Sequence, residues 1–116
     1  MKVFEYEDYK QFVNEWVSAQ PKKGYGQFKK IADFMAINSV VISQIFKGDR
    51  DLSLEQACDV AKYIGLDDFE KDFFLLLVQK GRAGSHDLQK TLQRQLQELK
   101  KKATTLKSRI KHKKFA

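Results

Sequence analysis

The stretch IADFMAINSVVISQIFKG, residues 31 to 48, decides the fold. Its apolar residues recur at three- and four-residue spacing, which indicates two short helices. Asn38 can cap the second helix, because its side chain can accept an N–H from the first turn, and Gly48 can end it. Ala32 is small enough for two steeply crossing helices to approach each other there. We therefore expect two helices joined by a tight turn over about 27 to 48.

Four further helices are expected around this pair. Apolar spacing, capping residues and glycines place them at about 6 to 19, 53 to 65, 68 to 81 and 85 to 109. Ser53 and Gln56 have the spacing of a capping box, and Gly65 can end the helix that they begin. One proline and six glycines in 116 residues favour long helices over a many-turned β fold. The predicted fold class is all-α, a five-helix bundle followed by one long basic C-terminal helix.

The positive charge is concentrated in two parts of the chain. Residues 86 to 116 carry ten Lys and Arg against two acidic residues, a balance of +8 in a chain whose total is +7. Residues 22 to 50 carry six Lys and Arg against two Asp, a balance of +4, and the stretches on either side of them up to residue 85 sum to −2 and −3. A basic segment between two acidic ones indicates a polarised surface that can meet a polyanion.

Several classes of protein are not expected. No apolar run approaches the roughly 18 residues of a membrane span. Cys58 has no partner for an intrachain disulfide, which favours the cytoplasm. His86 and His112 lack neighbours at metal-ligand spacing, so neither a metal site nor a cofactor is expected. No phosphate-binding glycine loop and no nucleophile motif is present, which argues against an enzyme with catalytic residues.

The stretch from Ile31 to Gly48 resembles the helix-turn-helix of phage repressors, the lambda-repressor-like domains, without gaps. The following stretch, 51 to 66, looks like the next helix of those domains, and the resemblance covers about 25 to 78. It combines small, apolar and capping residues at matching spacings. The resemblance implies a lambda-repressor-like domain that binds double-stranded DNA.

The chain is also similar to a narrower, uncharacterised family of bacterial transcriptional regulators. This similarity rests on residues 4 to 9 (FEYEDY), 48 to 52 (GDRDL) and 72 to 78 (DFFLLLV). Members of the family usually carry a longer C-terminal domain, where this chain has a basic helix. They also usually have glycine in place of Ala36, because that residue of the turn often needs a positive φ. Alanine would cost about 1 kcal/mol in such a conformation.

The resemblance implies roles for ten residues of the basic segment. The positions that face bases are Ser39, Val40, Ser43 and Gln44, and those that meet phosphate are Gln27, Lys29, Lys30, Asn38, Lys47 and Arg50. A Gln can bond adenine through both of its polar atoms, and a Val can pack on a thymine methyl group. Val40 stands where related repressors often have a hydrogen-bonding side chain.

The C-terminal helix needs a separate interpretation, with residues 1 to 84 as the DNA-binding domain and 85 to 116 as a basic helix and tail. Its apolar residues alternate at spacings of four and three, as in a coiled-coil seam: Leu92, Leu96, Leu99, Ala103, Leu106 and Ile110. Three interpretations remain open. The seam forms a homodimer through Leu92, Leu96 and Leu99, binds an acidic partner helix through them, or folds back on its own domain.

The function expected from the sequence is that of a cytoplasmic, nucleoid-associated, sequence-specific DNA-binding regulator without enzymatic activity. A nucleoid-type architectural binder that uses the basic tail is one alternative, and a protein-interaction adaptor is another. The +4 balance of residues 22 to 50 favours DNA over the adaptor. The short polar side chains expected on the second helix favour sequence readout over the architectural role.

Overall fold

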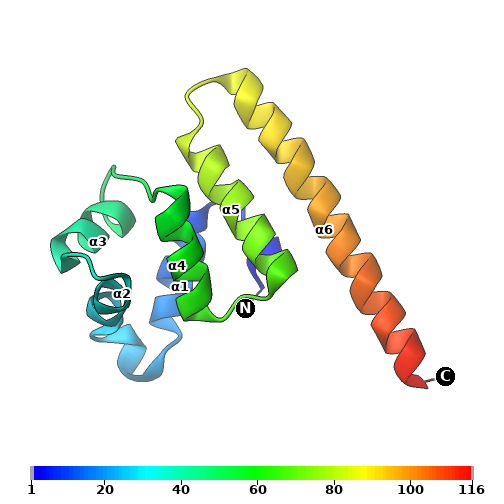
Figure 1. The fold of residues 1–116 in the computed structure, drawn as a ribbon, viewed down its shortest axis with the longest axis horizontal. Helices are drawn as coiled ribbons and strands as arrows, with labels where there is room; N and C mark the ends of the chain where they lie inside the picture. The colour runs from blue at the N-terminus through cyan, green and yellow to red at the C-terminus, as the bar shows by residue number, and fades with distance from the viewer. Residues whose placement is uncertain (1, 116) are drawn as a thin grey trace.

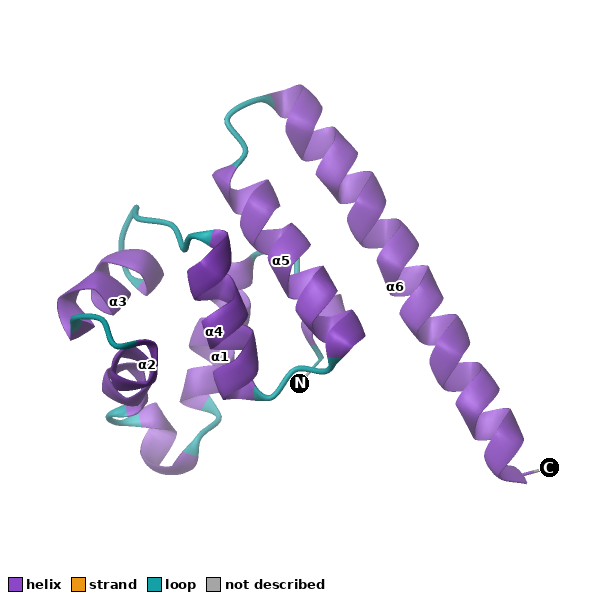
Figure 2. Ribbon diagram, viewed as in Figure 1, coloured by secondary structure: helices purple, strands orange, loops and turns teal. Residues whose placement is uncertain are grey.

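The computed structural model describes the backbone of residues 2–115 and the side chains of residues 2–106. This part of the chain is helical and contains no strand, which confirms the all-α prediction (Figure 2). Its elements are η1 (Val3–Glu5), α1 (Tyr9–Ser18), η2 (Pro21–Gly24), α2 (Gln27–Met35), α3 (Ser39–Phe46), α4 (Leu54–Ile64), α5 (Asp68–Arg82) and α6 (His86–Phe115). The α-helices begin and end within three residues of the predicted positions, except that α6 continues to Phe115.

The helices begin where the sequence offers a capping side chain. Asn38 Oδ1 accepts the N–H of Val40 at 2.8 Å and caps α3. Ser53 and Gln56 form the predicted capping box of α4, with both side chains bonded to backbone N–H groups. Asp67 makes an equivalent box with Glu70 at the start of α5. Local sequence therefore sets these boundaries.

One hydrophobic core joins the helices. The ring of Phe74, on α5, meets the rings of Tyr9 and Phe12 edge-on, at centroid distances of 6.2 and 5.9 Å. Ile42 and Ile45 bring α3 into the same core and are 0% exposed. Full burial of side chains of this size contributes about 1.5–3 kcal/mol each. The short α3 is thus held by packing more than by its own helix propensity.

The turn between α2 and α3 has the predicted left-handed residue. Ala36 lies at φ 55° and ψ 42°, just after α2 ends. Its N–H and that of Ile37 bond back to carbonyls of Asp33 and Ala32, so the turn closes the C-terminus of α2. Ala32 is 1% exposed, consistent with close packing of the two helices. An alanine in this conformation costs about 1 kcal/mol, which the packing of α2 and α3 must offset.

The C-terminal helix lies alongside α5 and runs antiparallel to it (Figure 1). Leu92 is 5% exposed, Leu96 2% and Ala103 4%, and Leu99 is partly buried against the core. The apolar face of α6 thus packs within the chain, as the fold-back interpretation expects. The predicted contact with a second copy or with an acidic partner helix through Leu92, Leu96 and Leu99 has no support in this arrangement, because the same side chains are already covered by the core.

The two antiparallel helices differ in length. Helix α6 has 30 residues and α5 has 15. The C-terminal part of α6 therefore runs past the beginning of α5, and its end lies far from α2 and α3 (Figure 1). None of the described helices is long and apolar enough to cross a membrane.

Candidate nucleic-acid interface

Helix α3 separates a buried face from an exposed one. Ile42, Ile45 and Phe46 are buried, and the four predicted base-facing residues, Ser39, Val40, Ser43 and Gln44, are all exposed. Val40 is 58% exposed, although it is apolar. The exposed face therefore carries uncharged side chains that are small or slender enough to approach the edges of bases in a groove.

Arg50 contacts the longest of these side chains. Its Nη1 donates to Gln44 Oε1 at 3.3 Å, and its backbone N–H donates to the Gln44 carbonyl at 3.2 Å. The first bond turns the Gln44 amide so that its oxygen faces Arg50. A residue predicted to read bases and one predicted to bind phosphate thus form one unit at the end of α3.

Lys47 is held near the start of α2. Its Nζ lies 5.7 Å from the ring centroid of Phe28, and that ring stacks on Phe46 at 5.6 Å. A cation over an aromatic ring at an exposed site gains about 0.5–1 kcal/mol. The contact places the ammonium group between the end of α3 and the first turn of α2.

The first turn of α2 carries three more predicted phosphate contacts. Lys29 and Lys30 are exposed, and Lys29 Nζ lies 3.8 Å from Asp33 in a solvated ion pair that contributes little. Gln27 Oε1 instead accepts the hydroxyl of Tyr63, on α4, at 3.1 Å. The two lysines are therefore accessible to an anion, and Gln27 keeps its amide nitrogen to donate to a phosphate while its oxygen binds Tyr63.

Asn38 also has a structural role. Because its side-chain oxygen caps α3, only its amide nitrogen remains to contact a phosphate. Its position at the N-terminus of α3 is as predicted, and its carboxamide oxygen fixes where the exposed face begins.

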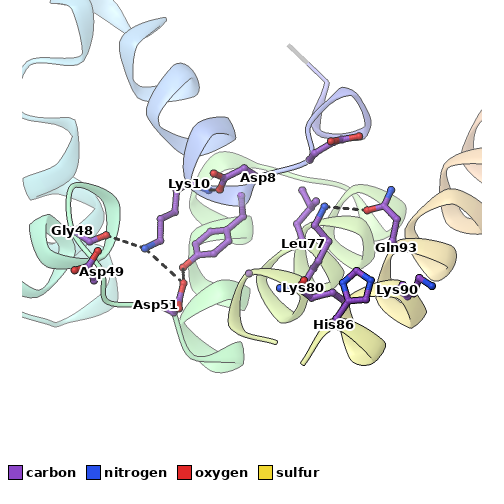
Figure 3. Close-up of a pocket in the computed structure, with 14 residues that line it drawn as sticks. Asp8, Lys10, Gly48, Asp49, Asp51, Leu77, Lys80, His86, Lys90 and Gln93 are labelled. Atoms are coloured by element: carbon purple, nitrogen blue, oxygen red, sulfur yellow. Dashed lines mark hydrogen bonds and ion pairs between the residues drawn. The ribbon is translucent and has the colours of Figure 1, made fainter. Parts of the chain in front are cut away.

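Three residues of α1, which sequence reasoning missed, hold the far end of α3. Asn14 Nδ2 donates to the carbonyl of Phe46 at 3.1 Å. Lys10 Nζ donates to the Gly48 carbonyl at 3.1 Å (Figure 3) and to the Arg50 carbonyl at 2.8 Å. Asn14 thus binds the last carbonyl of α3, and Lys10 holds the segment that follows the helix. We call Tyr9, Lys10 and Asn14 the α1 clamp.

Tyr9 is the buried member of the α1 clamp. Its hydroxyl donates to Asp51 Oδ1 at 2.6 Å and accepts the N–H of Leu52 at 3.1 Å. Burial, and then the hydrogen bond to Asp51, raise the pKa of Tyr9 well above the ordinary value of 10. Tyr9 therefore stays neutral at physiological pH and ties the segment after α3 to α1.

A groove of about 630 Å³ separates this segment from α6 (Figure 3). On one side lie Lys10 of α1 and Asp51 of the segment after α3. On the other, Lys80 Nζ donates to Gln93 Oε1 at 3.0 Å and links α5 to α6.

The described residues contain no cluster of three or more His, Cys, Asp or Glu that could hold a metal ion.

The sequence predicts a loop before α2 but did not reveal its backbone conformation. Lys22 and Lys23 both have left-handed backbones, with φ of 58° and 56°, and Tyr25 is 87% exposed. Gly24 follows at φ 81°, where a Cβ would meet the Val17 carbonyl oxygen at 2.2 Å. Lysine has no preference for a left-handed backbone, so nothing in the sequence indicated this conformation. The two adjacent lysines signalled only a local concentration of positive charge. The loop presents two cations and an aromatic ring beside the first turn of α2.

Comparisons with known proteins identify no relative: no family model, curated protein or solved structure matches the chain.

Proposed function

We propose that this protein binds double-stranded DNA through the exposed face of α3, as a sequence-specific transcriptional regulator without catalytic activity. In this proposal α2, the turn and α3 act as a helix-turn-helix, and α3 enters the major groove. The observation that carries the proposal is the composition of that face. It is uncharged at its centre and has exposed cations at its borders.

The centre of the face supports readout of bases. Ser39, Ser43 and Gln44 offer hydrogen-bonding groups, and Val40 offers an exposed apolar surface for a thymine methyl group. The contact with Arg50 orients the Gln44 amide before DNA arrives. A side chain that is already oriented loses less conformational entropy on binding.

The border of the face supports binding to phosphates. Lys29, Lys30, Lys47 and Arg50 are exposed, and the Lys29–Asp33 pair is the only ion pair that any of them makes within the described residues. Phosphate contacts fix the register of a protein on the duplex, and base contacts then supply specificity. The α1 clamp at the end of α3 keeps the base-facing and the phosphate-binding side chains at fixed positions relative to one another.

Selection from a random pool of duplexes tests the proposal directly. We expect the wild-type protein to enrich one short motif. Gln44→Ala should weaken binding to that motif by about 1–3 kcal/mol and leave the affinity for random DNA almost unchanged. Gln95→Ala, an exposed glutamine on α6, is the matched control and should change neither affinity.

Two results would contradict the proposal. One is a selected pool that stays as diverse as the starting pool. The other is an equal loss for Gln44→Ala on the enriched motif and on random DNA, because that loss would come from charge or folding and not from base readout. Circular dichroism of each variant separates a folding defect from a binding defect.

A further inference from the structure

We propose that one molecule binds two DNA duplexes at once, the first through α3 and the second through the exposed lysines Lys100 to Lys102 of α6. The inference rests on the proposed function for the first duplex only. It adds a second site of different character, which recognises the sugar-phosphate backbone and has no sequence preference.

The positions of the two helices require a second duplex. Helix α3 and the C-terminal end of α6 lie toward opposite ends of a molecule that measures 50 × 38 × 21 Å (Figure 1). The buried residues of α3 point into the core, so its exposed face is directed away from α5 and α6. A straight duplex seated on α3 therefore has the whole core between itself and the end of α6.

The charge on α6 suits a polyanion. Lys100, Lys101 and Lys102 are all exposed, and no described carboxylate forms an ion pair with them. The rest of the chain beyond Lys102 adds five Lys and Arg and no acidic residue. Like charges close together on a helix repel one another, and phosphate would relieve that repulsion.

The distribution of these cations favours nucleic acid over a membrane surface. Consecutive residues turn by about 100° on an α-helix, so Lys100 to Lys102 occupy both flanks and the outer side of α6. A helix that lies in a membrane interface keeps an apolar face free of charge. Here most of the apolar face packs on the core, with Leu96 and Ala103 buried. Among the described residues of α6, Leu88 and Leu106 are the large apolar side chains that stay exposed, at 46% and 39%, and the other exposed residues are polar or charged.

Packing on α5 also fixes the direction of the cationic segment. Leu96, Leu99 and Ala103 hold the middle of α6 on the core, and α6 continues beyond the beginning of α5. The second site is thus carried at a fixed distance from α3. A protein of this shape would join two duplexes, or two distant parts of one long DNA.

Stoichiometry with a short duplex tests the inference. On a duplex of about 15 base pairs, one and a half turns, a protein seated through α3 cannot reach the same DNA with α6. Sedimentation of the full chain at low salt should show one protein with two duplexes. Lys100→Gln, Lys101→Gln and Lys102→Gln together should weaken the second binding step at least tenfold and leave the first unchanged. The salt slope of the second step should fall by about 2–3.

The matched control replaces three cations elsewhere: Lys2→Gln, Lys62→Gln and Lys71→Gln together should change neither step. The inference is overturned if the wild-type protein saturates with one duplex. It is also overturned if the triple Lys→Gln variant of α6 binds the second duplex as tightly as the wild type does. A second step that poly-glutamate blocks as well as DNA does would also overturn it. Failure of the proposed function would give a different result. In that case Gln44→Ala would bind the enriched motif in the first step as tightly as the wild type does.

Discussion

Helices α3 and α6 expose polar surfaces of opposite kinds. Helix α3 has eight residues, is held by α1, α2 and the core, and offers uncharged groups at fixed positions. Helix α6 has 30 residues, packs on α5 over part of its length, and offers many similar cations. A surface of the first kind depends on the orientation of single side chains. Binding by a surface of the second kind depends on the number of cationic side chains, so its lysines are interchangeable.

Breaking the anchor of α6 should give the largest effect on stability. Leu96→Ala removes a side chain that is 2% exposed between α6 and the core, and we expect a loss of about 2–5 kcal/mol in the free energy of unfolding. Leu106→Ala, at a residue that is 39% exposed, is the control and should cost far less. Urea denaturation measures both. Equal losses would mean that α6 does not pack on the core in solution.

Loosening the α1 clamp should have a smaller effect on stability and a specific effect on α3. Tyr9→Phe leaves the buried N–H of Leu52 without its acceptor and removes a hydrogen bond to Asp51, which keeps its ion pair with Lys10, and this should cost about 1–3 kcal/mol. Binding to the enriched DNA motif should weaken more than binding to random DNA. Tyr25→Phe, at a residue 87% exposed, controls for loss of a hydroxyl and should leave the unfolding free energy unchanged.

The same variant carries a prediction about pH. The pKa of Tyr9 is raised in the folded state, so its contribution to stability is complete below the ordinary value of 10 and is lost as the pH rises above it. Unfolding free energies measured between neutral pH and about pH 11 should therefore fall more steeply for the wild type than for Tyr9→Phe. Parallel curves would show that Tyr9 ionises as freely as it does in the unfolded chain.

Relaxing the turn before α3 should have the smallest effect, and it should be stabilising. Ala36→Gly removes the cost of a left-handed alanine, and we expect a gain of about 0.5–1 kcal/mol in thermal or urea unfolding. Ala19→Gly is the matched control, because Ala19 is exposed and right-handed at the end of α1, so it should lose stability. A loss at both positions would contradict the left-handed turn.

Local signals in the sequence sufficed for most of the helices. Asn38 and Ser53 cap α3 and α4 as expected, and Ala36 has the positive φ that was expected from the glycine usual at this position in the proteins that the chain resembles. The exposure of Ser39 and Gln44 also follows from the helical period, because the alternate face is apolar. These features depend on neighbours within about one helical turn.

Features that depend on distant partners were not predictable. The heptad spacing of Leu92 and Leu96 showed that something covers them, but periodicity cannot tell a second chain from α5. Polar residues on α1, such as Lys10 and Asn14, resembled any solvated face, and their partners lie 32 to 40 residues away. The hydrogen bond between Gln27 and Tyr63 was likewise not predictable, because the two residues lie 36 positions apart.

The hydrogen bonds of Tyr9 also have a consequence for the order in which the chain can fold. They join residues 42 and 43 positions apart, and the Tyr9 ring packs on Phe74, farther still along the sequence. Contacts of such separation form late, because a long loop must close first. A nascent chain that ends at Arg50 would contain α2, α3 and the turn, yet neither partner of the Tyr9 hydroxyl. Helix α3 would then be a short, marginal helix whose final direction awaits the synthesis of α5.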